Sequence, residues 1–328
     1  MRAGRRGAHL AMENDVRNIP QKLYVLGHPV AHSKSPVMYN AVYAKLGFPW
    51  AYRLMDCETP AEAKAFLAAR DFLSVNITTP YKPEALAAAT ARAASAKLAH
   101  GANILVKKGD ALIAFNTDGR GCVGYLERTG FSFDGAKVAI CGTGPTALAI
   151  LHAAAIAGAS EVLCSRATGA CTRGSRPVCG CSSARSLHAT VDLQAAVDGH
   201  RSFLTAYDET TFKFGSYTTS TQAIAAADLV INATPLGMRE GDPAPFDVSL
   251  FHEGQRAFDV VYAHGETAFA AGAKAAGCTF ADGGGMLVAQ AVATVQAVCD
   301  VSGIDCELSF DELFEIMANA AGVQRIED

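Results

Sequence analysis

A glycine-rich turn between an apolar strand and a helix constrains the fold of this chain most strongly. Residues 137–141 (KVAIC) form a compact apolar run typical of a buried strand. They lead into the turn GTGPTA at 142–147, and an Ala/Leu-rich helical segment follows to about Gly158. Strand, glycine turn and helix in that order predict the start of a βαβ unit, and therefore a parallel sheet in this part of the chain.

The same turn suits a dinucleotide. Its glycines let the backbone approach a pyrophosphate, and the helix that follows offers N–H donors and positive potential at its N-terminus. A G-x-G-x-x-A pattern alone is a weak signal, but here it is flanked correctly and the next predicted strand follows at 161–164. The predicted cofactor contacts in the turn are Gly142, Thr143, Gly144, Pro145, Thr146 and Ala147.

The end of the next strand distinguishes between the two nicotinamide dinucleotides. An acidic residue there would hold the ribose hydroxyls of NAD, whereas this chain has Ser165 and Arg166. Because a guanidinium pairs well with a 2′-phosphate, the sequence favours NADP over NAD. A solvated arginine after a strand is the alternative interpretation, and Arg173 or Arg176 could share the task.

Strands and helices alternate along most of the chain, which predicts an α/β fold with a largely parallel sheet. The predicted strands cover residues 22–27, 51–55, 74–78, 100–106, 111–115, 137–141, 161–164, 228–231, 256–261 and 278–281. The predicted helices cover residues 37–46, 60–70, 83–90, 92–98, 120–128, 145–158, 191–197, 222–227, 266–276, 283–301 and 310–321.

A polar strand end lies at residues 76–82 (NITTPYK). An apolar run stops there, and Pro80 prevents further ladder pairing. Asn76 and Thr78 share one face of the predicted strand, and Lys82 follows just past the break. An amide, a hydroxyl and an amine together describe a site for a hydroxyl-rich ligand with a proton donor. A solvated turn with an inert lysine is the alternative.

Three other turns carry small polar or glycine residues. Pro36 suits the first position of a helix and Ser35 its N-cap, whereas Ser33 has no such structural role. The two serines could therefore bind a carboxylate at the start of the helix. Thr234 lies in a turn at the carboxyl end of a strand, where open α/β sheets bind ligands. Gly283 begins a run of three glycines that permits close backbone approach. We predict cofactor contacts at Thr234 and Gly283.

Composition excludes several classes of function. A chain of 328 residues suits two domains, and its net charge of −4 gives no reason to expect a nucleic acid or an anionic membrane as partner. No apolar run in the sequence approaches the ~20 residues of a membrane span. Residues 1–20 are expected to be a disordered extension.

The ten cysteines are scattered along the chain, which indicates reduced thiols in a cytoplasmic protein. Cys141 and Cys164 fall within apolar runs and are expected to lie in the core. Cys171, Cys179 and Cys181 lack a paired Cys-x-x-Cys spacing, so we predict a surface insertion there and no metal site.

Seven motifs, in order, resemble the shikimate dehydrogenase family over nearly the whole chain from Lys22. They are GHPVAHSKSP at 27–36, NITTPYK at 76–82, NTDG at 116–119, GTGPTA at 142–147, NATPLGM at 232–238, DVVY at 259–262 and GMLVAQ at 285–290. Residues Ile104, His264 and Pro145 depart from the usual family pattern, which bears on cofactor affinity more than on the reaction.

The resemblance implies two domains, an α/β substrate-binding domain with a mostly parallel sheet and a Rossmann-type NADP-binding domain. We expect 21–118 plus 284–328 to form the first and 119–283 the second, with a long irregular insertion at about 167–221. The implied activity is the reversible NADPH-dependent reduction of 3-dehydroshikimate to shikimate, in the shikimate pathway to chorismate and aromatic amino acids. A cytoplasmic monomer or homodimer without a metal is expected.

By the family pattern, Lys82 and Asp118 form the catalytic pair. Hydride arriving at a carbonyl carbon builds negative charge on the oxygen, which Lys82 would stabilise as a proton donor or a cation. Asp118 would hold the ammonium group in place by charge attraction. The resemblance further implies that the serine pair binds the substrate carboxylate. The implied substrate contacts are Ser33, Ser35, Asn76, Thr78, Asn103, Tyr262 and Gln290.

Two alternatives stay open at this point. One is a quinate/shikimate dehydrogenase that uses NAD, against which the Ser33–Ser35 pair and Arg166 count. The other, from a different class of function, is a catalytically inactive protein that senses shikimate or quinate. Such a protein could lose Lys82, Asp118 and the phosphate-binding turn, and this chain has all three.

Overall fold

The structure, a computed structural model, describes residues 16–167 and 209–323, and the chain divides into two compact units. The first unit comprises Met1–Thr117 and Val288–Asp328, and the second comprises Asp118–Leu287. We had predicted domain boundaries at 118/119 and 283/284, close to these. Each unit holds one sheet covered by helices, and the predicted α/β fold is confirmed.

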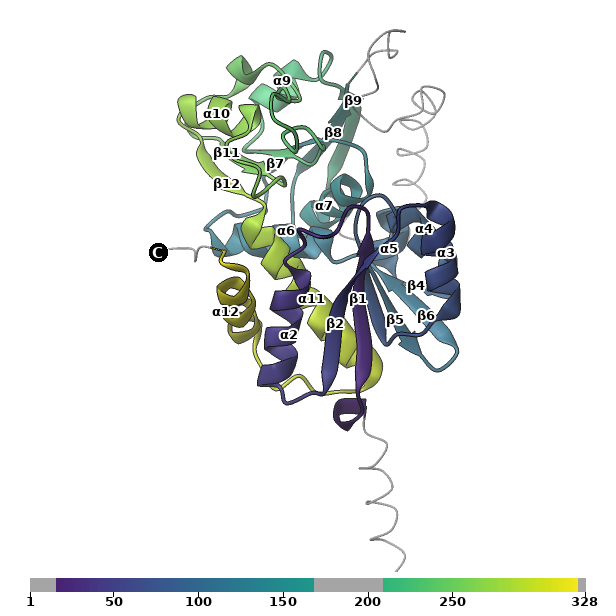
Figure 1. Cartoon of the computed structure of the whole chain (residues 1–328). Coiled ribbons are helices and arrows are strands. Elements are labelled where there is room, and N and C mark those ends of the chain that lie inside the picture. Colours follow the sequence, from purple (N-terminus) through teal and green to yellow (C-terminus); the bar gives the residue numbers. More distant parts are fainter. Residues whose placement is uncertain (1–15, 168–208, 324–328) are drawn as a thin grey trace, which may run out of the picture. The chain divides into compact units, whose positions relative to one another are not determined.

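The first unit is built on a six-stranded sheet in the order β2-β1-β3-β5-β6-β4. β5 runs antiparallel to β3 and β6, and the other pairings are parallel. Figure 1 shows these strands in the part of the chain drawn from purple to blue. The strands are β1 (Gln21–Gly27), β2 (Trp50–Asp56), β3 (Ser74–Ile77), β4 (Ala91–Arg92), β5 (Ile104–Lys108) and β6 (Ala111–Phe115).

Helices cover both faces of this first sheet. On one face, side chains of α3 and α4 pack with Leu26, Val75 and Ile77 of the central strands. α2 and α12 lie beside each other on the other side (Figure 1). The helices of the unit are α2 (Ser35–Lys45), α3 (Pro60–Ala69), α4 (Lys82–Ala88), α5 (Ala94–Leu98), α12 (Phe310–Ala321) and most of α11 (Gly284–Ser302).

The second unit holds a sheet whose pairings are all parallel, in the order β12-β11-β10-β7-β8-β9. Alternate residues of its central strand face opposite sides: Val138 and Ile140 pack with α6 and α7, and Ala139 and Cys141 with α9 and α10. This is the doubly wound arrangement expected of a Rossmann-type domain. The strands are β7 (Lys137–Cys141), β8 (Glu161–Arg166), β9 (Thr211–Ser216), β10 (Leu229–Asn232), β11 (Arg256–Asp259) and β12 (Thr279–Asp282), and the helices are α6 (Asp118–Arg128), α7 (Pro145–Ile156), α9 (Thr221–Ala225) and α10 (Ala268–Ala275).

Some predicted elements differ from the observed ones. The predicted helix over 92–98 begins only at Ala94, because Ala91 and Arg92 pair with β6 as the short strand β4. The region expected to be irregular contains strand β9 at its end, whereas the predicted helix at 191–197 lies outside the described residues. Residues 16–20 are ordered, contrary to prediction, and the carbonyl of Val16 accepts a hydrogen bond of 3.0 Å from the Trp50 indole.

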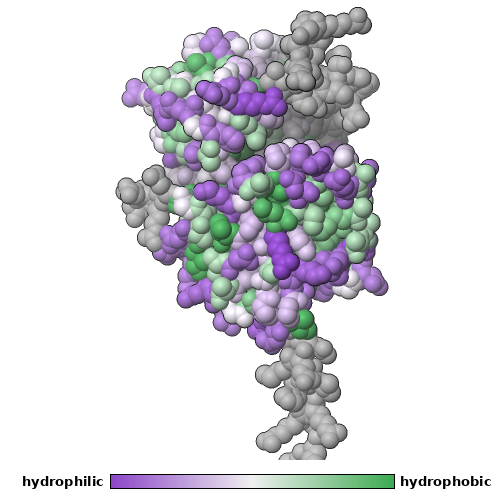
Figure 2. Space-filling model, in the orientation of Figure 1, coloured by the Kyte–Doolittle hydropathy of each residue, from purple (hydrophilic) through white to green (hydrophobic). Residues whose placement is uncertain are grey.

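One described helix, α11, is long and apolar enough to cross a membrane by length and composition, although no apolar run of that length was predicted. Its most apolar window is 72% buried within the structure, as expected for the core helix of a globular protein. The surface in Figure 2 mixes hydrophilic and hydrophobic areas. The exposed large hydrophobic side chains of the described residues are Ile19, Val37, Leu54, Ile156 and Met238.

Candidate active site

Three of the predicted substrate residues of the first unit, Ser33, Ser35 and Thr78, follow the carboxyl ends of β1 and β3. These two strands are neighbours in the sheet, and the loops that leave them contact each other through the backbone N–H of His28, which donates to the carbonyl of Thr79 at 3.1 Å. The loops approach so closely at Gly27 that a Cβ there would lie 2.3 Å from Cγ2 of Thr78. Glycine at this position therefore allows the two loops to lie together.

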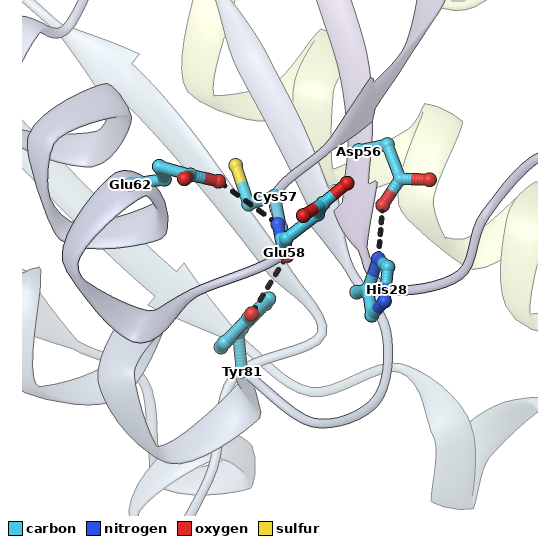
Figure 3. A network of polar contacts seen from close by, with 6 residues as sticks. All are labelled: His28, Asp56, Cys57, Glu58, Glu62 and Tyr81. Carbon is cyan, nitrogen blue, oxygen red and sulfur yellow. Dashed lines mark hydrogen bonds and ion pairs between the residues drawn. The ribbon is translucent and has the colours of Figure 1, made fainter.

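The turn that carries Lys82 is anchored to the end of β2 (Figure 3). The buried hydroxyl of Tyr81 donates a hydrogen bond of 2.7 Å to the carbonyl of Cys57. His28 and Asp56 pair beside it, with 2.7 Å between Nδ1 and Oδ1. Both contacts join the loops after β1 and β3 to the end of β2, so the backbone just before Lys82 is held from a strand two places away in the sheet.

Lys82 is the first residue of α4, and its side chain is half-buried. Its carbonyl accepts a hydrogen bond of 2.9 Å from the backbone N–H of Ala102, the residue before Asn103. The carbonyl of Asn103 in turn accepts from the N–H of Ile77 at 2.8 Å. The structure thus brings the backbones of Lys82 and Asn103 to the same edge of the sheet.

Asn103 is buried and forms two hydrogen bonds with Thr117. Its Nδ2 donates to the Thr117 hydroxyl at 2.8 Å, and its Oδ1 accepts from the Thr117 backbone N–H at 2.9 Å. Gln290 lies next to this pair, with its Oε1 3.5 Å from the Asn103 amide nitrogen and from the Thr117 hydroxyl. Asn103 and Gln290, 187 residues apart, therefore belong to one polar cluster.

Asn76 belongs to the same cluster through Thr294 of α11. The Asn76 amide nitrogen lies 3.5 Å from the Thr294 hydroxyl, which is 3.2 Å from the Thr117 hydroxyl. On its other side, Asn76 Oδ1 accepts a hydrogen bond of 2.9 Å from the hydroxyl of Tyr52. Tyr52 is fully buried, and burial raises its pKa well above the usual value. It therefore stays a neutral hydroxyl that can donate.

The serine pair differs from the predicted arrangement in one respect. α2 begins at Ser35 itself, and the hydroxyl of Ser33 accepts a hydrogen bond of 3.3 Å from the Ser35 backbone N–H. Ser35 is buried, and its proximity to Tyr52 slightly opposes the rise in the tyrosine pKa that burial causes. The prediction that Ser35 caps the helix was therefore wrong, because Lys34 takes the N-cap position and Ser35 is already helical.

Three members of the cluster were not predicted as site residues: Tyr52, Thr117 and Thr294. Thr117 was predicted only as part of the NTDG motif at 116–119, and Tyr52 only as part of a strand. Thr294 follows Gln290 by four residues, so the two lie on one face of α11. That spacing, one helical turn after a predicted contact, was the signal that could have found it.

In the second unit, the glycine turn joins β7 to α7 as predicted. Gly142 has φ +118°, and a Cβ there would lie 2.7 Å from the carbonyl oxygen of Ala233 in the turn after β10. Gly144 precedes α7 with open space where a side chain would be, and no side chain caps this helix. The first turn of α7 therefore offers backbone N–H groups at an uncrowded helix N-terminus, which fits a pyrophosphate.

Two predicted cofactor contacts need correction. Ala147 is fully buried among the core side chains between sheet and helix, so it serves close packing. Ser165 is also fully buried, and its hydroxyl lies 3.4 Å from the carbonyl of Ile140. The reason is that β8 ends at Arg166 and not at 164 as predicted. Ser165 therefore lies within the strand, and its side chain is buried against the sheet. Arg166, half-exposed at the strand end, keeps its predicted position.

The turns after β10 and β11 are joined by a buried carboxylate. Asp259 accepts hydrogen bonds from the side chains of Asn232 (3.0 Å) and Thr267 (2.7 Å), and burial raises its pKa. Thr234 donates to Asn232 Oδ1 at 2.6 Å and accepts from the backbone N–H of Leu236 at 3.1 Å. The hydroxyl of Thr234 therefore stabilises its own turn.

Gly283 and Tyr262 lie near the same edge. A Cβ on Gly283 would lie 2.1 Å from the carbonyl oxygen of Val260, so the close approach predicted for this glycine is to the chain itself. Tyr262 is partly buried, which raises its pKa. It follows β11 and lines a hollow of about 200 Å³ together with Gly265 and Lys274.

Asp118, the first residue of α6, is buried and accepts a hydrogen bond of 3.0 Å from the hydroxyl of Thr146. Within the described ranges 16–167 and 209–323, no group of three or more His, Cys, Asp or Glu side chains could hold a metal ion. The cysteines at 171, 179 and 181 lie outside these ranges.

Comparison with known proteins gives matches over most of the chain. Residues 25–105 match the family described as shikimate dehydrogenase substrate binding domain. A protein of Moorella thermoacetica named shikimate dehydrogenase (NADP+) is 34% identical over 272 residues, which cover 82% of this chain and 84% of that protein. The chain belongs to the shikimate dehydrogenase family.

Solved structures of the shikimate dehydrogenase family and its relatives have the same fold. The shikimate 5-dehydrogenase of Thermus thermophilus in complex with shikimate has a TM-score of 0.66 at 26% identity, covering 92% of this chain and all of that one. The quinate dehydrogenase of Corynebacterium glutamicum in complex with NAD has a TM-score of 0.70 at 24% identity, covering 92% and 100%. The second likeness shows the fold alone.

Proposed function

We propose that this chain catalyses the reversible NADPH-dependent reduction of 3-dehydroshikimate to shikimate, in the shikimate pathway to chorismate and aromatic amino acids. The observation that carries the proposal is the polar cluster at the carboxyl edge of the first sheet, which joins Asn76, Asn103 and Gln290 beside Lys82. Buried amides and hydroxyls in one cluster suit a ligand with several ring hydroxyls. The relative from Moorella thermoacetica, named shikimate dehydrogenase (NADP+), supports it.

Substrate contacts would come from several strand ends and from helix α11. The hydroxyls of Ser33 and Ser35 would bind the carboxylate at the start of α2. Asn76, Thr78, Asn103 and Gln290 would bind the ring hydroxyls, and Tyr262 would complete the substrate contacts from the second unit. A site built from buried amides and hydroxyls rejects analogues that lack a matching hydroxyl, because its polar groups would be left unpaired.

NADP fits the second unit on two grounds. The glycine turn leaves open space at Gly144, and Arg166 at the end of β8 can pair with a 2′-phosphate. The residues that would hold the cofactor are Gly142, Thr143, Gly144, Pro145, Thr146 and Arg166, with Thr234 and Gly283 shaping the neighbouring turns. The nicotinamide, when bound, supplies the hydride.

Proton transfer would fall to Lys82. Its ammonium group would donate a proton to the substrate oxygen as negative charge develops there, a contribution that is typically ~10²–10⁴-fold. Asp118 would orient that ammonium group by charge attraction. These roles need no metal ion and no nucleophile.

The test measures turnover of shikimate and quinate with NADP+ and NAD+ separately. We expect the highest kcat/KM with shikimate and NADP+. Equal or better efficiency with quinate and NAD+ would assign the chain to the quinate-using branch instead. Absence of any turnover with retained shikimate binding would support the sensing protein.

We also propose that the enzyme acts in the cytoplasm as a monomer or homodimer. The cysteines of the described residues are free, and six of the seven are buried, as expected for reduced thiols. Sedimentation velocity at micromolar concentration distinguishes monomer from dimer, and a larger assembly would contradict the proposal.

A further inference from the structure

The hydroxyl of Thr146 connects the dinucleotide turn to Asp118. Thr146 is the second residue of α7, directly after the glycine turn, and Asp118 is the first residue of α6. Oγ1 of Thr146 donates to Oδ2 of Asp118 at 3.0 Å. Asp118 as a whole residue is only 6% exposed, so this hydrogen bond is largely shielded from water. Hydrogen bonds from a donor to an ionised acceptor are among the stronger ones in proteins.

Packing between the two helices holds this contact in place. A Cβ at Gly119, next to Asp118, would lie 2.0 Å from the carbonyl oxygen of Ala149 in α7. The start of α6 therefore lies directly against the backbone of α7. Ala147, beside Thr146, is fully buried in the same core. Neither helix start can shift without disturbing this contact, so the separation of Thr146 and Asp118 is set by the backbone.

The Thr146 hydroxyl could bind either the Asp118 carboxylate or a phosphate of the cofactor, and its single proton distinguishes these two roles. A threonine hydroxyl has one proton to donate, and in this structure it is directed at Asp118. A phosphate bound at the helix N-terminus would be served by backbone N–H groups, which need no threonine side chain. The side chain of Thr146 is thus engaged with the carboxylate, while its backbone remains part of the dinucleotide turn.

We propose that Thr146 is a positioning residue for Asp118, which fixes the carboxylate in the orientation used in proton transfer. The inference rests on the proposed function, since it gives Thr146 a role only if Asp118 acts in the reaction. It also adds to the predicted cofactor contact of Thr146 a role for its side chain, as a link between the dinucleotide turn and the reacting groups. Replacing it should therefore lower kcat and leave NADP+ affinity nearly unchanged.

The test compares wild type, Thr146→Val, Asp118→Asn and the double variant, with Thr146→Ser as the conservative control. Valine keeps the branched shape and removes the hydroxyl; serine keeps the hydroxyl. We expect Thr146→Val to lower kcat about 5–20-fold, with the KM and Kd for NADP+ within about 2-fold of wild type. Thr146→Ser should recover most of kcat. In the Asp118→Asn background, Thr146→Val should have little further effect.

Two kinetic outcomes would overturn the inference. A rise in the Kd for NADP+ with unchanged kcat would make Thr146 a phosphate contact. If Thr146→Val lowers kcat by the same factor in the wild type and in the Asp118→Asn variant, Thr146 does not act through that carboxylate.

Urea unfolding of wild type, the two single variants Thr146→Val and Asp118→Asn, and the double variant tests the contact without any turnover. Non-additive changes in the unfolding midpoint would support the hydrogen bond, and additive changes would contradict it. If wild type turns over no shikimate, the proposed function fails, and the unfolding cycle still decides whether Thr146 and Asp118 are coupled.

Discussion

Asn103 and Thr117 hold each other through two hydrogen bonds that run in opposite directions. The amide of Asn103 donates to the Thr117 hydroxyl at 2.8 Å and its oxygen accepts from the Thr117 backbone N–H at 2.9 Å. Thr117 is the last residue before Asp118. The same asparagine that is proposed to bind substrate therefore also fixes the backbone that leads to the proposed catalytic aspartate.

Asn103→Ala should impair both stability and substrate binding. It removes both hydrogen bonds, so the hydroxyl and the backbone N–H of Thr117 lose Asn103 as a partner. This should lower the free energy of unfolding by about 1–3 kcal/mol. The KM for shikimate should rise while the KM for NADP+ stays near wild type. Urea unfolding and initial rates measure the two effects.

Thr117→Val provides the matched control for that substitution. It removes the hydrogen bond to the Thr117 hydroxyl and keeps the backbone N–H, which donates to Oδ1 of Asn103. We expect a smaller loss of stability and a smaller rise in the KM for shikimate than with Asn103→Ala. If both variants raise that KM equally, Asn103 acts only through Thr117 and is not itself a substrate contact.

Lys82→Ala should nearly abolish turnover. Loss of a positioned proton donor lowers the rate by ~10²–10⁴-fold, whereas substrate binding depends on several other groups. We therefore expect kcat to fall by about that factor and the Kd for shikimate, measured by calorimetry, to rise only several-fold. Lys97→Ala, at an exposed position in α5, is the matched control and should keep wild-type rates. Undiminished turnover in Lys82→Ala would refute the assigned role.

The parts of the site that the sequence predicted are local in the chain. The glycine turn at 142–147 and the break at Pro80 follow from the backbone preferences of consecutive residues. Tyr52 and Thr294 contact Asn76 from 24 and 218 residues away, and only the assembled sheet and α11 bring them together. The separation of Tyr52 from Asn76 leaves no periodic pattern in the sequence, whereas Thr294 is indicated only by its spacing from Gln290 within α11.

Errors at strand ends had a different physical cause. Ser165 was predicted to face a ligand because the strand was expected to end at Cys164, but two further residues pair with β9. Because side chains alternate between the two faces of a sheet, a small error in the strand end changes which residue is accessible. The two-residue strand β4 is too short to show any alternation at all.

Tyr81→Phe should destabilise the first unit without altering the preference of the enzyme for NADP over NAD. The hydroxyl of Tyr81 is buried and donates to the carbonyl of Cys57 at 2.7 Å, and phenylalanine would leave that carbonyl without this donor. We expect a loss of about 1 kcal/mol in the free energy of unfolding and a lower kcat, because Lys82 follows directly. Tyr24→Phe, on a partly exposed ring, serves as control. Equal stabilities of the two variants would contradict the anchoring role.

Arg166→Asp should change the preference between the two dinucleotides. An aspartate at the end of β8 repels a 2′-phosphate and can accept hydrogen bonds from the ribose hydroxyls of NAD. We expect kcat/KM for NADP+ to fall by about 10²-fold or more and that for NAD+ to rise, because a charge-assisted pair is replaced by like-charge repulsion. Arg239→Asp, at an exposed position after β10, controls for the change in net charge. An unchanged ratio would show that Arg166 does not bind the phosphate.

Gly119→Ala should strongly destabilise the second unit, whereas Gly124→Ala in the same helix should not. A Cβ at Gly119 would lie 2.0 Å from a backbone oxygen of α7, so one helix must move away from the other, at about 1–3 kcal/mol or more. At Gly124 nothing lies within 4 Å of the added Cβ, and alanine favours the helix by about 0.5–1 kcal/mol. Urea unfolding measures both, and equal effects would contradict the close packing of α6 on α7.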